Sequence, residues 1–231
     1  MFPGRCPVCD EILFEKNKIE RPQICKECNK KLTYIKQPVC FKCGKQLDDD
    51  SKEYCYDCMR KNFSYTRGVA AFSYSDAMKT SMYAFKYNNR REYAGFYANV
   101  IADEFGSIIL SWKPDVLIPV PMYKAKMRKR GYNQAEVLAN RLSEKLGIPM
   151  DAKILERTRD TVPQKELKEE ERKNNIKNAF RIRKNGLEYS KIVLVDDIYT
   201  TGTTIDECAK VFLQAGVSRV YFITACIGKG F

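Results

Sequence analysis

The stretch that decides the fold runs from Ile192 to Thr204 and reads IVLVDDIYTTGTT. It opens with a continuous apolar run, Ile192 to Val195, of the kind found in parallel strands that are covered on both faces. Two acids follow, then a run of threonines around Gly202, and then the apolar spacing of a helix. This order predicts a buried strand, a tight loop and a helix.

Strands and helices alternate through the rest of the chain. The expected strands are 69–75, 115–122, 191–197 and 219–227, and the expected helices are 76–89, 93–110, 133–147 and 203–216. Such alternation predicts an α/β domain with a central, mainly parallel sheet and flanking helices. Ligands in these sheets bind beyond the carboxyl ends of the strands. We place this domain at 63–231, after a small cysteine-rich module at 1–62.

The two acids and the loop together suit a phosphorylated sugar. Asp196 and Asp197 can accept hydrogen bonds from vicinal ribose hydroxyls, and Gly202 permits a turn that a side chain would block. Backbone N–H groups of the loop converge at the start of the next helix, whose dipole favours an anion. An ordinary capped helix start is the alternative, but capping needs one threonine and not four in five positions. The predicted phosphate-binding residues are Thr200, Thr201, Gly202, Thr203 and Thr204.

Eight of the ten cysteines fall in four Cys-x-x-Cys pairs. Two such pairs supply the four thiolates of a structural Zn²⁺ site. A disulfide framework would need an oxidising compartment, and a redox motif would normally occur once. We expect two zinc sites with consecutive pairs sharing an ion, because shorter loops cost less entropy to close; a cross-braced pairing is the alternative. The expected ligands are Cys6, Cys9, Cys25 and Cys28, then Cys40, Cys43, Cys55 and Cys58.

Charge and composition narrow the classes of function. The chain has no histidine, which excludes histidine triads and histidine-ligated metal centres. The net charge is +12, and nearly all of this excess lies after residue 60. Two four-thiolate zinc sites would make the first module negative, which weighs against a zinc finger that grips DNA by its own charge. The basic remainder would attract phosphates, nucleic acid or acidic proteins.

Two further features bear on location and on the remaining cysteines. No run approaches the ~18 apolar residues that span a bilayer, and the start lacks the apolar core of a signal peptide. We therefore expect a soluble, cytoplasmic protein without membrane insertion. Cys208 and Cys226 fall inside an expected helix and an expected strand, and we expect both to be core thiols.

Residues 192–204 resemble the signature by which type I phosphoribosyltransferases bind 5-phosphoribosyl-1-pyrophosphate (PRPP). The resemblance implies that Asp196 and Asp197 hold the ribose at the catalytic centre, that Thr200 to Thr204 hold the 5-phosphate, and that Mg²⁺ accompanies PRPP. With the segments 118–135 and 163–180 and the cysteine module, the chain is similar to the ComF family of bacterial competence proteins. The resembling positions are Pro119, Pro121, Arg128, Arg130, Gly131, Asn133, Gln134, Gln164, Leu167, Arg172, Asn175 and Phe180.

Two charged segments leave alternatives open. The segment from Tyr123 to Gly131 holds five cations and is expected as a loop, in which Arg128 and Arg130 could clamp a pyrophosphate. A solvated surface loop and a nucleic-acid contact are the alternatives. Residues 160–178 are polar, and the resemblance implies a lid there; an amphipathic helix is the alternative.

The resemblance implies a PRPP-binding protein that serves DNA uptake in natural transformation and has phosphoribosyl transfer as an activity. One alternative is a phosphoribosyltransferase of nucleotide metabolism whose acceptor the sequence does not identify. Another is a catalytically silent regulator that senses PRPP. Single-stranded DNA and a competence helicase would be the partners, with aromatic residues such as Tyr83 and Tyr87 stacking on bases. The helical spacing around these tyrosines equally predicts core residues, and the oligomeric state stays open.

Overall fold

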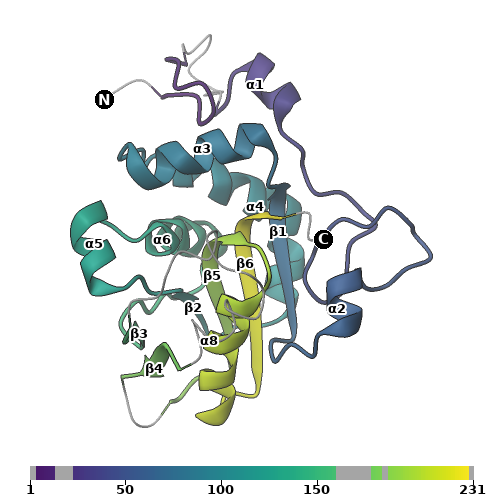
Figure 1. Ribbon diagram of the computed structural model, residues 1–231, viewed down its shortest axis with the longest axis vertical. Helices are drawn as coiled ribbons and strands as arrows, with labels where there is room; N and C mark the ends of the chain where they lie inside the picture. The colour runs from purple at the N-terminus through teal and green to yellow at the C-terminus, as the bar shows by residue number, and fades with distance from the viewer. Residues whose placement is uncertain (1–3, 14–22, 160–177, 184–186, 229–231) are drawn as a thin grey trace.

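The computed structural model describes residues 4–13, 23–159, 178–183 and 187–228 (Figure 1). Most of the segment for which a lid was expected, residues 160–177, lies outside the described residues. So do four of the resembling positions, Gln164, Leu167, Arg172 and Asn175.

A parallel sheet forms the centre of the protein. Within the described residues its four strands lie in the order β1-β6-β5-β2, and every neighbouring pair runs parallel. All four expected strands are therefore confirmed, and the apolar run Ile192 to Val195 is completely buried inside β5. The bounds are β1 (Arg67–Ser73), β2 (Val116–Pro119), β5 (Lys191–Tyr199) and β6 (Arg219–Ile227).

The expected helices are also present, and their ends follow from local sequence. The Ser75 hydroxyl accepts from the Met78 N–H at the start of α3, and the Asn133 side chain accepts from the Ala135 N–H at the start of α6. Gly147 ends α6 in the left-handed region at φ 68°. The bounds are α3 (Asp76–Tyr87), α4 (Tyr93–Ser111), α6 (Gln134–Leu146) and α8 (Thr203–Gln214).

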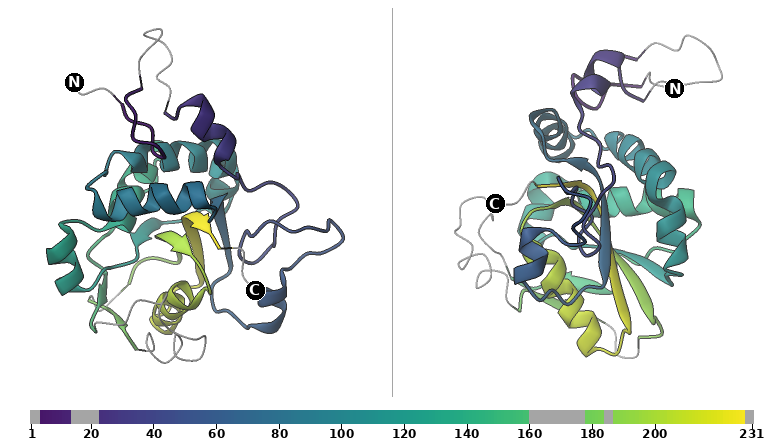
Figure 2. Two further views of the ribbon diagram at one scale, coloured as in Figure 1. Left: turned by 45° about the horizontal axis from the view of Figure 1, so that its top comes forward. Right: turned by 90° about the vertical axis from the view of Figure 1, so that its right-hand side faces the viewer.

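These helices cover both faces of the sheet and one of its ends. In the right-hand view of Figure 2, α4 and α6 lie on one side of the sheet and α8 lies on the other. Helix α3 crosses near the ends of the arrows of β5 and β6, as the left-hand view shows. Helix α3 therefore lies near the end of the sheet toward which β5 carries the acidic pair.

Several short elements differ from the expectations. The segment expected as a loop after β2 forms helix α5 (Lys124–Arg130), because Lys, Ala, Met and Arg are good helix formers, and it ends at Gly131 with φ 83°. A small antiparallel pair, β3 (Leu155–Arg157) and β4 (Phe180–Ile182), was not expected from the sequence. Helices α1 (Lys26–Lys31) and α2 (Tyr56–Arg60) lie in the cysteine-rich segment.

The main core extends beyond the central sheet. It runs from Leu32 to Ile227 and includes Val39, Cys43 and Leu47 of the cysteine-rich segment. Cys6, Leu13 and Cys28 form a small cluster of their own. The two halves of that segment are therefore built differently, since only the second is packed into the core of the larger domain. The division at residues 62 and 63 stays a prediction.

Two other expectations can be compared with the structure. Cys208 and Cys226 are completely buried, which confirms both as core thiols. Among the described residues, no helix has the length and apolar character that crossing a membrane requires.

Gly68 on β1 provides a test of the packing between β1 and β6. A β-carbon at this position would overlap the ring of Phe222, which is itself completely buried. We expect Gly68→Ala to lower the free energy of unfolding by about 1–3 kcal/mol through overpacking. Gly95→Ala is the matched control, because a β-carbon at Gly95 in α4 meets open space, and it should stabilise the protein by ~0.5–1 kcal/mol. Chemical denaturation of both variants measures the difference; equal effects would contradict this account of β1.

Candidate functional site

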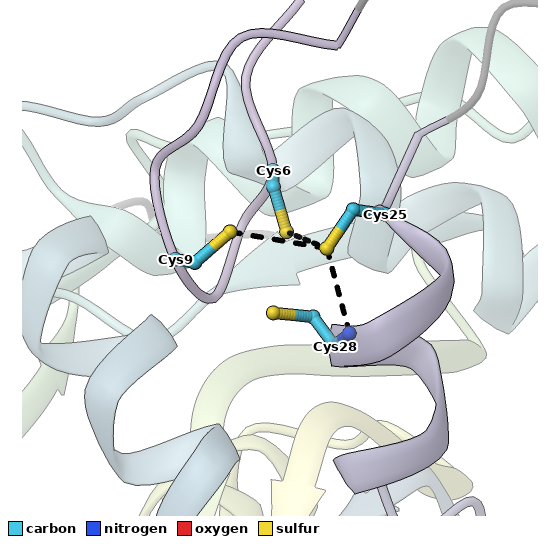
Figure 3. A group of neighbouring side chains, drawn as sticks. All are labelled: Cys6, Cys9, Cys25 and Cys28. Carbon is cyan, nitrogen blue, oxygen red and sulfur yellow. Dashed lines mark hydrogen bonds between the residues drawn. The ribbon is translucent and has the colours of Figure 1, made fainter.

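The first group of cysteines has the geometry of a metal site. The sulfurs of Cys6, Cys9, Cys25 and Cys28 all lie within 4.8 Å of one another (Figure 3). The Cys6 and Cys25 sulfurs are 3.7 Å apart, and those of Cys9 and Cys25 are 3.8 Å apart. A tetrahedron with Zn–S bonds of about 2.3 Å has edges of about 3.8 Å. The four thiols therefore fit Zn²⁺.

The second group has the same geometry and is more deeply buried. Cys40, Cys43, Cys55 and Cys58 also lie within 4.8 Å of one another, and the Cys43 and Cys55 sulfurs are 3.7 Å apart. Consecutive pairs thus meet at one centre, as the shorter loops favoured. In each group the last pair lies at the start of a short helix, α1 or α2, where the helix N-terminus favours thiolate charge.

The acidic pair lies within a strand. Strand β5 continues past Asp196 and Asp197, because Asp196 pairs with Thr224 and Tyr199 pairs with Ile227 on β6. The expectation that the strand would end at the acids is therefore wrong. On its other side, β2 ends at Pro119 opposite Val195, so β2 does not extend alongside the acids. The two side chains are half-buried.

Lys86 is a site residue that sequence reasoning missed. Its ammonium lies 2.7 Å from Asp197 Oδ2, and the two side chains are only 20% and 13% exposed. Burial opposes the charge on Lys86, yet Asp197 beside it and Asp196 nearby raise the pKa of the ammonium above its ordinary value. One signal existed in the sequence: Lys86 follows the buried residues Met78 and Met82 at intervals of four along α3.

The carboxyl of Asp196 has a raised pKa. Burial and then the negative charge of Asp197 raise the pKa of its carboxyl to about 7. The backbone N–H of Asp197 donates to Asp196 Oδ1 at 2.8 Å and, together with Lys86 and Arg157, limits the rise. Near neutral pH this side chain is therefore divided between the acid and the carboxylate.

The threonine loop has the expected strand–loop–helix form. It leaves β5 after Tyr199, and Gly202 precedes α8 with φ 79°. A β-carbon at Gly202 would collide with the Tyr199 hydroxyl and lie 3.0 Å from a ring carbon of Phe63, so glycine is required twice over. The Thr201 and Thr203 hydroxyls lie 2.9 Å apart. Thr200 is exposed, and Thr201, Thr203 and Thr204 are half-buried.

The predicted pyrophosphate clamp lies beside α3. Arg130 stacks its guanidinium 4.9 Å from the centre of the Tyr87 ring and donates to Gln134 Oε1 at 2.7 Å. Arg128 is exposed on α5. Arg130 therefore contacts the last residue of α3, the helix that also carries Lys86.

A cavity of about 960 Å³ opens on the other side of the threonine loop. It lies between the segment that follows α2, strand β4 and helix α8. Thr201 and Thr203 line it, whereas Asp196 and Asp197 do not. The remaining residues that line it are Arg60, Lys61, Asn62, Phe63, Asn178, Phe180, Arg181, Ile182, Asp206, Glu207, Lys210, Val211, Gln214 and Ala215.

Two family models match the chain. A double zinc ribbon domain matches residues 1–59, and a phosphoribosyl transferase domain matches residues 97–230. The first match and the two sulfur clusters together identify two structural, four-cysteine zinc sites. The second match covers the sheet from β2 to β6, including the acidic pair and the threonine loop.

Several bacterial proteins are similar over most of the chain. Competence protein F of Haemophilus influenzae is 32% identical over 169 residues, which is 71% of this chain and 73% of that protein. DNA utilization protein YhgH of Salmonella typhi is 30% identical over 177 residues, 73% of this chain and 75% of that protein. Competence protein ComFC of Bacillus subtilis is 31% identical over 150 residues, 64% of this chain and 58% of that protein.

The raised pKa of Asp196 predicts how stability depends on pH. Because its pKa of about 7 in the folded state exceeds the ordinary value of 3.8, protonation stabilises the folded state, and this contribution is lost as the pH rises through about 7. Asn cannot ionise. The stability gained by Asp196→Asn over wild type should therefore grow by on the order of 2 kcal/mol between about pH 5 and pH 8, then level off. Urea denaturation at several pH values measures this; a gain independent of pH would contradict the assignment.

Proposed function

Because this chain belongs to the ComF family and carries a phosphoribosyl transferase domain, we propose that it binds PRPP at the acidic pair and the threonine loop. The observation that carries the proposal is their arrangement: Asp196 and Asp197 lie on β5, and the loop joins them directly to the start of α8. Carboxylates that can accept from ribose hydroxyls are thereby followed, a few residues along the chain, by a helix start that favours an anion.

Each group has a role in this proposal. Asp196 and Asp197 accept hydrogen bonds from the ribose hydroxyls. Backbone N–H groups and hydroxyls between Thr200 and Thr204 donate to the 5-phosphate. Lys86 fixes the orientation of Asp197 through the 2.7 Å ion pair. Arg128 and Arg130 on α5 provide cations for the pyrophosphate.

The donor set also fits Mg²⁺ bound together with PRPP. Magnesium prefers oxygen ligands and keeps several waters, and Asp196 offers carboxylate oxygens that Lys86 does not occupy. When bound, the ion would neutralise charge that develops on a departing pyrophosphate. The chain itself would hold the ribose and phosphate in place, so that positioning supplies much of the rate.

We further propose phosphoribosyl transfer to a nucleophile as the activity of this site. A regulator that senses PRPP would bind the same ligand without consuming it. The two alternatives differ in one measurement, the disappearance of PRPP in the presence of a panel of bases and amines. A phosphoribosyltransferase of nucleotide metabolism would show turnover with a free base from that panel.

Removing the acidic pair tests the PRPP site. We expect Asp196→Ala combined with Asp197→Ala to weaken PRPP binding by about a hundredfold or more, since two charge-assisted hydrogen bonds are lost. Calorimetric titration with PRPP and Mg²⁺ measures the affinity, and circular dichroism checks the fold. Asp48→Ala combined with Asp50→Ala removes the same charge from exposed positions and should leave the affinity unchanged. Retained binding in a folded Asp196/Asp197 variant would refute the site.

A second proposal concerns single-stranded DNA, and a specific surface supports it. Tyr83 and Tyr87 are 60% and 61% exposed on α3, with ring centres 4.9 Å apart. Arg130 covers one of these rings, and α5 contains five cations and no acid. Exposed aromatic rings beside a cationic helix are the features that bind single strands. Two neighbouring aromatic residues, Phe85 and Tyr132, belong to the core and are not part of this surface.

We extend the proposal to DNA uptake, and the names of the relatives, two competence proteins and a DNA utilization protein, support it. A competence helicase is the proposed protein partner. We also propose a cytoplasmic location, because four-thiolate zinc sites need cysteines that stay reduced.

The tyrosine pair gives a direct test of DNA binding. Tyr83→Ala combined with Tyr87→Ala should weaken binding of an oligothymidine strand by about tenfold or more, because each stacked base contributes ~1–3 kcal/mol. Tyr54→Ala combined with Tyr56→Ala is the control, since these exposed tyrosines lie in the zinc module. Fluorescence anisotropy at several salt concentrations measures the affinity. Equal loss in both pairs would refute the surface.

The same titration separates the two uses proposed for α5. If Arg128 and Lys129 contact DNA phosphates, replacing both with Gln should reduce the salt slope by about 0.7 per lost contact. If they contact pyrophosphate, PRPP affinity falls instead and the slope stays the same. No change in either would make α5 a solvated surface helix.

A further inference from the structure

A short linker between the second four-cysteine site and β1 packs against the threonine loop. Beginning five residues after Cys58, its residues Phe63, Ser64 and Tyr65 all face the loop or the helix that follows it. The Tyr65 hydroxyl lies 2.7 Å from the Tyr199 hydroxyl, and the Ser64 N–H donates to Asp206 Oδ1 at 2.6 Å. The threonine loop therefore has hydrogen-bonded supports on both sides, one at the end of β5 and one in the first turn of α8.

The apolar contacts in this region are close and fixed. Tyr65 is completely buried, and its ring centre lies 5.1 Å from that of Phe63 and 4.9 Å from that of Phe222. Tyr199 stacks on Phe222 with an interplanar angle of 8°. The Phe63 ring fills the space beside Gly202 in which a side chain would have to sit. Close packing of Tyr199 and Gly202 leaves these two positions of the loop region little freedom to rearrange.

The zinc module also contacts Tyr65 and the strand that follows it. The Lys42 ammonium lies 5.3 Å above the Tyr65 ring, and the Lys42 carbonyl accepts from the Gly68 N–H at 2.9 Å. Gly44 packs so closely on the Gly68 backbone that a β-carbon there would lie 2.7 Å from its carbonyl oxygen. The turn that carries Cys40 and Cys43 is thus fixed against the strand that follows Tyr65.

The first four-cysteine site contacts a different region. Asp10, in its cysteine turn, pairs with Arg90 and accepts from the Tyr93 hydroxyl at 2.5 Å, at the junction of α3 and α4. Its cysteines Cys6 and Cys28 belong to the separate small cluster. The two four-cysteine sites therefore contact different parts of the domain, so a variant at the first site can serve as a control for a variant at the second.

We propose that Tyr65 and Asp206 are positioning residues that hold the threonine loop against the second four-cysteine site, in the form that binds a 5-phosphate. The inference rests on the proposed PRPP site and deepens it. Neither side chain needs to touch the ligand. Each restricts the loop before binding, so less order has to be acquired when the phosphate arrives.

The test compares two tyrosine variants that lose the same atom. Tyr65→Phe removes the hydroxyl bonded to Tyr199, and Tyr93→Phe removes the hydroxyl bonded to Asp10 at the first site. Calorimetric titrations use three probes: PRPP with Mg²⁺, ribose 5-phosphate, and inorganic pyrophosphate. Tyr65→Phe should weaken the affinity for PRPP and for ribose 5-phosphate roughly two- to tenfold, which is the effect of one hydrogen bond. Its affinity for pyrophosphate should be unchanged. Tyr93→Phe should leave all three unchanged.

Asp206 provides an independent variant with a conservative rescue. Asp206→Ala removes the acceptor for the Ser64 N–H and should weaken the affinity for ribose 5-phosphate by a similar factor. Asp206→Asn keeps an oxygen at that position and should restore most of the affinity. Zinc content and thermal unfolding are measured for every variant, so that lost metal or lost structure is recognised separately.

The outcomes distinguish this inference from the proposed function. If the wild-type chain binds neither PRPP nor ribose 5-phosphate, the proposed function fails, and the inference fails with it. If the wild type binds both and Tyr65→Phe and Asp206→Ala bind equally well, only the inference is overturned. The inference is also overturned if Tyr65→Phe loses as much affinity for pyrophosphate as for ribose 5-phosphate, or if Tyr93→Phe loses as much affinity as Tyr65→Phe. The effect would then be a general one.

Discussion

The parallel pairing of β5 with β6 is the constraint on which the rest of the structure depends. Ile192 to Val195 are completely buried between helices on both faces, and the pairing continues to Tyr199 opposite Ile227. A parallel strand that is buried on both faces tolerates neither a register shift nor a polar insertion, since every residue is covered. The pairing of β5 therefore fixes the positions of the residues that follow the apolar run, which are the two acids and then the threonine loop at the start of α8.

Placing two acids on such a strand has an electrostatic cost, and Lys86 partly offsets it. Burial, and then the repulsion between two carboxylates on adjacent residues, favour protonation of Asp196. The ion pair between Lys86 and Asp197 lowers the local negative charge but removes an ammonium from water. An arrangement that is unfavourable for stability and built from three separate charges is more easily explained by ligand binding than by folding. These three charges therefore support the proposed site independently of family membership.

The sequence was sufficient for the parts of the fold that have a strong local signal. The apolar runs gave all four strands of the central sheet, and the periodicity and caps gave α3, α4, α6 and α8. It was insufficient where the signal was short or tertiary. The three-residue strands β3 and β4 have no period to recognise, and α5 is so polar that its charge suggested a loop. The contact of Lys86 with Asp197 joins residues more than a hundred positions apart, so that no local pattern contains it.

The cysteine pairs show the same limit in a sharper form. Their spacing predicted two four-thiolate sites and the correct pairing, since ligand number and loop length are local properties. Spacing cannot distinguish a module that folds around its own metal from one that shares a core with a neighbour. The first site has its own small cluster, whereas Cys40, Cys43 and Cys55 are part of the main core together with Tyr65 and Tyr199. The second zinc site is therefore better regarded as part of the domain that carries the threonine loop, and its metal as part of what stabilises that domain.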